Sequence, residues 1–94
     1  MSWKESLSEV IARQFDLQAA AGLSESALED LLTRRIEELI ASRPEYFFHL
    51  MYRIDLDESQ LHQALTTATE PARRVAQMVI RRQKEKWAAR RKKR

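Results

Sequence analysis

The sequence predicts an all-α protein, a compact bundle of four to five helices with a basic C-terminal helical extension. One glycine and two prolines in 94 residues leave few turn-forming positions, which favours a small number of long elements. Apolar residues recur at spacings of three and four along most of the chain, as they do on one face of a helix. A hydrophobic content of 44% with 33% charged residues is typical of a globular chain.

The first helix is expected from Ser2 to Ala21. An apolar stripe at helical spacing marks it, and Gly22 should end it because glycine readily takes the left-handed conformation after a helix. The stripe consists of Trp3, Leu7, Val10, Ile11 and Phe15.

The second helix is expected to begin after Ser24 and to end near Ser42. Ser24 as N-cap places Leu23 and Leu28 as a hydrophobic staple. Ser26 is an alternative N-cap, because Glu29 then completes a capping box. The apolar residues of this helix are Leu28, Leu31, Leu32, Ile36, Leu39 and Ile40.

The third helix is short and aromatic. Pro44 suits its first turn, and Ser42 with Glu45 is expected to form a capping box. Apolar residues on nearly every side predict either the most buried helix or a contact surface. The inward stripe is expected to be Phe47, Leu50, Met51 and Ile54.

Asp57 is expected to cap a fourth helix, with Gln60 completing an approximate capping box. A run of threonines then favours termination. Its inward residues are expected to be Leu61, Ala64, Leu65 and Ala68.

Pro71 is well placed to begin the last helix. Its apolar face is expected to comprise Ala72, Val75, Ala76, Val79 and Ile80. Beyond this face only Trp87 continues the stripe, so we expect the helix to leave the body of the protein there. Residues 1–80 are therefore assigned to a helical bundle domain and residues 81–94 to a basic helical tail.

Charge is distributed unevenly along the chain. Residues 81–94 hold nine Lys or Arg and one acid, whereas residues 1–80 hold eight Lys or Arg and thirteen acids. A basic segment of this kind is either a solvated end or a phosphate-binding one, in which an indole stacks on a base. The candidate polyanion-binding residues are Arg81, Arg82, Lys84, Lys86, Trp87, Arg90, Arg91, Lys92, Lys93 and Arg94.

The sequence argues against an enzyme and against a metal or cofactor. There is no cysteine, and His49 and His62 stand thirteen residues apart, which matches no common zinc spacing. The acids at Asp55 and Asp57 are better explained as helix caps, and no nucleophile stands beside a base. We therefore expect a non-enzymatic protein with no catalytic residue, no bound metal, no cofactor and no small-molecule substrate.

Because aromatic residues and arginine dominate interface hot spots, the aromatic segment offers a candidate protein-binding patch, which consists of Tyr46, Phe48, Tyr52 and Arg53. The alternative is a core helix whose Arg53 pairs with Asp55 or Asp57 across the turn. Aromatic-rich helices are most often buried, so the sequence favours this alternative.

The string Leu50-Met-Tyr-Arg-Ile-Asp-Leu-Asp-Glu58, with Ile11-Ala-Arg-Gln-Phe-Asp-Leu17 upstream, resembles short uncharacterised bacterial helical proteins that carry a similar "LYRID" turn. The resemblance covers about the first two-thirds of the chain and does not include the basic segment. It implies a bacterial, compact helical protein and supplies no activity, ligand or catalytic residue.

Two functions are expected from the sequence. The first is a small non-enzymatic module that binds a protein partner or a second copy of itself. The second is a nucleic-acid- or ribosome-associated accessory protein that binds phosphates through its basic segment. We expect a cytoplasmic protein, because there is no secretory signal and no apolar run of the length that spans a membrane.

Overall fold

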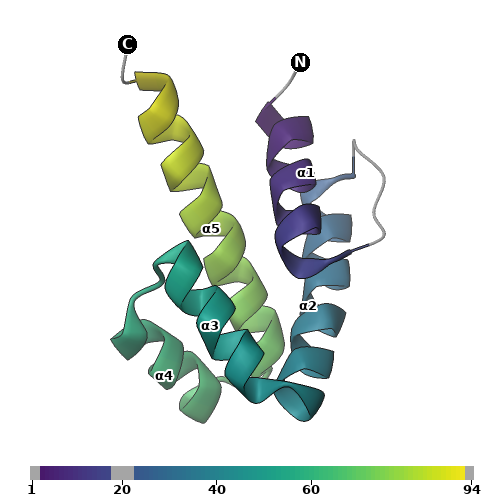
Figure 1. Cartoon of the computed structure of the whole chain (residues 1–94), viewed down its shortest axis with the longest axis vertical. Helices are drawn as coiled ribbons and strands as arrows, with labels where there is room; N and C mark the ends of the chain where they lie inside the picture. Colours follow the sequence, from purple (N-terminus) through teal and green to yellow (C-terminus); the bar gives the residue numbers. More distant parts are fainter. Residues whose placement is uncertain (1–2, 18–22, 93–94) are drawn as a thin grey trace.

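The computed structural model describes residues 3–17 and 23–92, and within these ranges the chain is all-helical. The five helices of these ranges are α1 (Trp3–Phe15), α2 (Glu25–Ser42), α3 (Pro44–Ile54), α4 (Glu58–Thr67) and α5 (Pro71–Lys92) (Figure 1). The predicted all-α class is confirmed. Among the described residues, none of the helices is both long and apolar enough to cross a bilayer.

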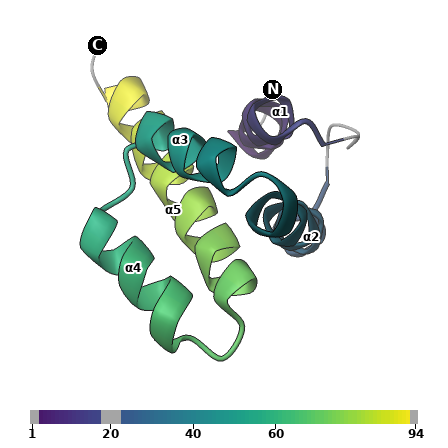
Figure 2. The same cartoon turned by 60° about the horizontal axis from the view of Figure 1, so that its bottom comes forward.

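Helix α5 is the longest and most central helix of the bundle. Its 22 residues extend about 33 Å at 1.5 Å per residue, which nearly matches the 37 Å longest dimension of the chain. All four other helices contact α5, and the contact with α2 is the most extensive. Figure 2 shows α4 on one side of α5 and α1 and α2 on the other.

The core forms where the apolar stripes of the helices meet. The stripes predicted for α3 and for the first part of α5 are confirmed, because each of their residues is buried. Phe15 and Leu7 of α1 complete this core from the far side. The most deeply buried large side chains are Ile11, Phe15, Leu28, Leu32, Ile36, Leu39, Phe47, Ile54, Val75 and Val79.

The helix starts follow the predicted caps at two of three positions. Ser24 Oγ accepts a hydrogen bond from the Ala27 amide at 3.1 Å, so Ser24 is the N-cap of α2. The Asp57 carboxylate caps α4 by accepting from the amides of Ser59 and Gln60 at 2.8 and 3.3 Å. Each of these contacts satisfies an amide that the first turn leaves without a partner.

The capping box predicted for Ser42 and Glu45 is wrong. Ser42 Oγ donates back to the Glu38 carbonyl at 2.7 Å, so the hydroxyl is used at the end of α2. Arg43 is the N-cap of α3 and makes no side-chain cap hydrogen bond. Pro44 starts the helix because its ring fixes a helical φ where no amide hydrogen is needed.

Helix α1 ends at Phe15, six residues before the predicted end at Ala21. Asp16 takes the left-handed conformation with φ 55°, and the Leu17 amide donates to the Ala12 carbonyl at 2.8 Å. This is the Schellman arrangement, in which a left-handed residue turns the chain and satisfies a terminal carbonyl. The predicted stop at Gly22 lies outside the described residues.

The end of α3 repeats this arrangement. Asp55 has φ 68° and ψ 46°, and the Leu56 amide donates to the Met51 carbonyl at 3.2 Å. Aspartate occupies the left-handed region more easily than most residues with a β-carbon. Both helices therefore end at an Asp-Leu pair rather than at a glycine.

An arginine from another helix lies beside each of these aspartates. Arg35 of α2 donates through Nε to the Phe15 carbonyl at 2.9 Å and lies 4.0 Å from the Asp16 carboxylate. Arg82 of α5 bonds to Asp55 at 3.1 Å. A cation at the end of a helix also interacts favourably with the helix dipole.

The prediction that helix α5 leaves the body of the protein after Ile80 is wrong for the residues that follow directly. Gln83 is only 7% exposed, and its Nε2 donates to Gln14 Oε1 of α1 at 2.7 Å. The next residue, Lys84, forms an ion pair with Glu25 of α2 at 2.6 Å. Polar contacts therefore hold α5 against α1 and α2 where its apolar stripe ends, and a separate basic extension is not observed in the described residues.

The left-handed residue at the end of α1 gives a stability prediction. Asp16→Gly and Asp16→Ala both remove a carboxylate that is 93% exposed, so they differ mainly in backbone preference. We expect the alanine variant to be less stable than the glycine variant by about 1–2 kcal/mol, the cost of a β-carbon in this region. Urea denaturation monitored by circular dichroism measures the difference, and equal stabilities would contradict the assigned conformation.

The Gln83–Gln14 hydrogen bond gives a second prediction. We expect Gln83→Ala to lower the free energy of unfolding by about 1–2 kcal/mol, because Gln14 loses its partner in a partly buried position. Gln63→Ala on the exposed side of α4 is the matched control and should stay within about 0.5 kcal/mol of the parent chain. An equally small effect at both positions would show that α5 is not held against α1 at Gln83.

Candidate interaction surfaces

Helix α3 divides into a buried face and an exposed face. Its buried stripe packs into the core, and at about 100° per residue the opposite side carries a separate set of side chains. We call this set the outer face of α3. It consists of Glu45, Phe48, His49, Tyr52 and Arg53, all of them exposed.

Two aromatic residues dominate the outer face. Phe48 is 47% exposed and Tyr52 is 73% exposed, and they are the large exposed hydrophobic residues of the described chain. They are four positions apart, so they are neighbours on the helix surface. The Phe48 ring packs edge-to-face against the ring of the buried Phe47, with 5.1 Å between the ring centroids, so Phe48 is in contact with the core. The favoured interpretation of α3 as a core helix thus holds for Phe47 and not for Phe48 or Tyr52.

Tyr46 does not belong to this surface. It is half-buried against the core, and the Arg43 guanidinium lies 4.6 Å from the centre of its ring. This cation–π contact uses the ring at the start of α3.

Arg53 does not make the pairing that the core interpretation required. Asp55 bonds to Arg82 at 3.1 Å, and the Asp57 carboxylate is used in capping α4. Within the described part of the chain, Arg53 and Glu45 form no ion pair, and both are exposed. The outer face therefore has a carboxylate near its first turn, an aromatic pair in its middle and a guanidinium near its last turn.

The predicted polyanion-binding residues whose side chains the structure describes, which lie between Arg81 and Trp87, do not form one open basic surface. Arg82 bonds to Asp55 at 3.1 Å and to Glu85 at 3.4 Å, and Lys84 bonds to Glu25 at 2.6 Å. Arg81 is exposed, whereas Lys86 and Trp87 are half-buried. The side chains of residues 90–92 and the whole of residues 93–94 lie outside the described structure, so the predictions for Arg90, Arg91, Lys92, Lys93 and Arg94 stay predictions.

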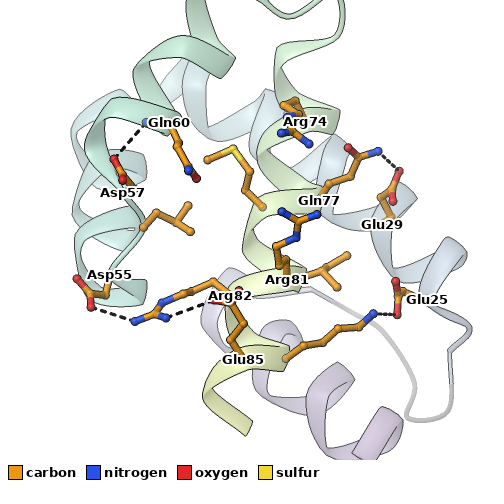
Figure 3. A pocket seen from close by; sticks show the side chains of 14 residues that line it. Glu25, Glu29, Asp55, Asp57, Gln60, Arg74, Gln77, Arg81, Arg82 and Glu85 are labelled. Atoms are coloured by element: carbon orange, nitrogen blue, oxygen red, sulfur yellow. Dashed lines mark hydrogen bonds and ion pairs between the residues drawn. The ribbon is translucent and has the colours of Figure 1, made fainter. Parts of the chain in front are cut away.

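A groove of about 650 Å³ runs along α5 between α2 and α4 (Figure 3). Arg74, Gln77 and Arg81 line it from α5, at spacings that place them on one side of that helix. Its two sides are acidic, with Glu25 and Glu29 on α2 and with carboxylates near the start of α4. Those carboxylates belong to Asp55 and Asp57.

The acids of the groove are engaged by partners within the protein. Glu29 accepts from Arg73 at 2.7 Å and from Gln77 at 3.3 Å. Arg73 also lies 3.0 Å from Asp30, and its hydrogen bonds to Glu29 and Asp30 raise the pKa of the guanidinium above its ordinary value. This network ties the start of α5 to α2.

The balance of charge in the groove is close to neutral. The groove is lined by five acids and four bases, so it lacks the positive excess that attracts a polyanion. This groove could not be predicted from the sequence, because its acids come from three separate segments, namely α2, the turn after α3, and α5 itself. One signal was present, since Arg74, Gln77 and Arg81 recur at helical spacing beside the apolar stripe of this segment.

No group of three or more His, Cys, Asp or Glu within the described ranges is arranged to hold a metal ion. His49 lies on the outer face of α3, and His62 is exposed on α4. The two histidines thus belong to different helices and show no common site.

Comparisons with protein-family models, with curated proteins and with solved structures find no match to this chain. The resemblance suggested by the string from Leu50 to Glu58 therefore stays a prediction. What the surfaces themselves present is the basis for a functional proposal.

Proposed function

We propose that this protein is a small non-enzymatic interaction module that binds a protein partner, either a different protein or a second copy of itself, through the outer face of α3. The exposure of Phe48 and Tyr52 is the observation that carries the proposal. Aromatic residues and arginine supply most of the binding energy at protein interfaces, and all three residues stand on one short helix. Absence of cysteine fits the reducing cytoplasm, where we place the protein.

The exposed aromatic area is large enough to matter. An aromatic side chain buries about 150–250 Å², so exposures of 47% and 73% leave roughly 180–300 Å² available on Phe48 and Tyr52 together. At about 25 cal/mol per Å², covering that area yields about 5–7 kcal/mol before the costs of association. Those costs are of a similar size, so neighbouring contacts must contribute.

The outer face is held in a fixed orientation. Pro44 fixes the start of α3, the Schellman arrangement at Asp55 fixes its end, and Arg82 ties that end to α5. Four residues of the opposite face are buried in the core. A rigid surface loses little conformational entropy on binding, which favours recognition through α3.

A nucleic-acid- or ribosome-associated role is the second candidate, favoured by the excess of basic residues between Arg81 and Arg94. Its test needs a deletion that spares the fold. Removal of residues 88–94 keeps Gln83 and Lys84, which bond to α1 and α2. If this candidate is right, fluorescence anisotropy will show salt-sensitive binding of single-stranded RNA by the full chain and its loss in the shortened one.

Site-specific photocrosslinking tests the principal proposal. A benzophenone amino acid at Tyr52 should form covalent adducts with a protein partner in cells that produce the chain, because this side chain projects from the outer face of α3. The same amino acid at Gln63, exposed on α4, is the control and should form few adducts. Phe48→Ala should reduce the adducts formed at position 52. Equal crosslinking at both positions, or none at Tyr52, would count against the proposal.

A further inference from the structure

We propose that the partner of the outer face of α3 is a second copy of this chain, packed antiparallel across a twofold axis. This inference rests on the proposed function and names its partner. The charges and aromatic residues of the outer face complement themselves when the helix is reversed.

The aromatic residues of the outer face and its basic residues lie on different flanks of α3. At about 100° per residue, Phe48 and Tyr52 fall to one side of Glu45, and His49 and Arg53 fall to the other. A twofold axis perpendicular to a pair of antiparallel helices brings like flanks together. Aromatic residues of the two copies therefore meet on one flank, the flanks that carry His49 and Arg53 meet on the other, and Glu45 lies between them.

The order of residues along α3 then sets their partners. With the axis near the middle of the helix, Phe48 lies opposite Tyr52 of the second copy, and Glu45 lies opposite Arg53 of the second copy. Aromatic pairs of this kind add to the energy of simple burial. Each contact occurs twice, which is the self-complementarity that a twofold interface requires.

Charge decides between the antiparallel and the parallel arrangement. In a parallel pair unlike flanks meet, so Glu45 on the midline would face Glu45, which is unfavourable, and Arg53 would lie beside the aromatic flank of the second copy without an acid opposite it. In the antiparallel pair both acids face arginines. Because neither residue has an ion-pair partner among the described residues, these contacts cost no existing ion pair within that part of the chain.

The size of the helix limits the strength of the dimer. Eleven residues span about 16 Å, so the interface falls below the roughly 1,200 Å² at which stable complexes begin. We therefore expect a reversible dimer with a dissociation constant on the order of hundreds of micromolar.

Sedimentation equilibrium tests this proposal over loading concentrations from about 10 μM to about 1 mM, which bracket the expected affinity. The average mass of the full chain should rise with concentration from 11.1 kDa towards that of a dimer. Glu45→Arg and Arg53→Glu should each weaken dimerisation by about tenfold, because each places like charges opposite one another.

Two combinations of these substitutions, a mixture of the single variants and a double variant, show whether weaker dimerisation comes from lost charge pairing or from damage to the fold. An equimolar mixture of the Glu45→Arg and Arg53→Glu chains should restore association, since one copy then carries two cations and the other two anions. The double variant should also regain self-association to within about threefold of the parent chain. Glu37→Arg and Arg34→Glu make the same charge changes on the exposed side of α2 and should leave association unchanged.

The outcomes distinguish this inference from the function on which it rests. A chain that stays monomeric throughout, while position 52 crosslinks to a different protein, overturns the dimer and leaves the proposed function intact. A monomer that also forms no adducts at position 52 overturns both. A dimer that the α2 substitutions weaken as much as the α3 substitutions overturns the assignment of its interface to α3.

Discussion

The structure depends on the packing of four helices against the apolar stripe of α5. Ala72 and Ala76 are small enough to let a neighbouring backbone approach closely, and Val75 and Val79 fill the space between. Helix α2 uses this surface most extensively, and α4, α1 and α3 pack around it. In a domain of 94 residues there is little other apolar surface to bury, so loss of this stripe would affect every helix.

Polar contacts fix the helix ends around this apolar centre. Two helices end at a left-handed aspartate, and an arginine from a different helix binds beside each one. These exposed or half-exposed pairs add little stability individually. Their value is geometric, because they set where α1 and α3 stop and thus which side chains reach the surface. At α3, the pairing of Asp55 with Arg82 leaves Arg53 on the outer face.

Much of the fold could be predicted from helical spacing and capping residues, because these act locally. Ser24, Asp57 and both prolines mark helix starts as their chemistry dictates. The end of α1 was missed because three alanines and Gly22 follow it, and local propensity favours continuing to the glycine. The structure instead uses Asp16-Leu17, the same pair that ends α3 as Asp55-Leu56. The continued packing of α5 was missed for a related reason, since Gln83 occupies a core-facing position with a polar side chain whose partner, Gln14, is distant in sequence.

Helical spacing separates Phe47 from Phe48, but it could not show that Phe48 stays exposed, because a core helix can bury aromatic residues on more than one side. The two phenylalanines differ only in direction, by about 100° around the helix, and the positions of α2 and α5 decide which one is buried. Once Phe47, Leu50, Met51 and Ile54 have filled the core, a bundle this small has no second apolar layer to receive the remaining rings. Burial within the described part of the chain therefore does not account for Phe48 and Tyr52. Their placement beside an acid and an arginine, on a helix fixed at both ends, is the arrangement expected of a surface that another polypeptide covers.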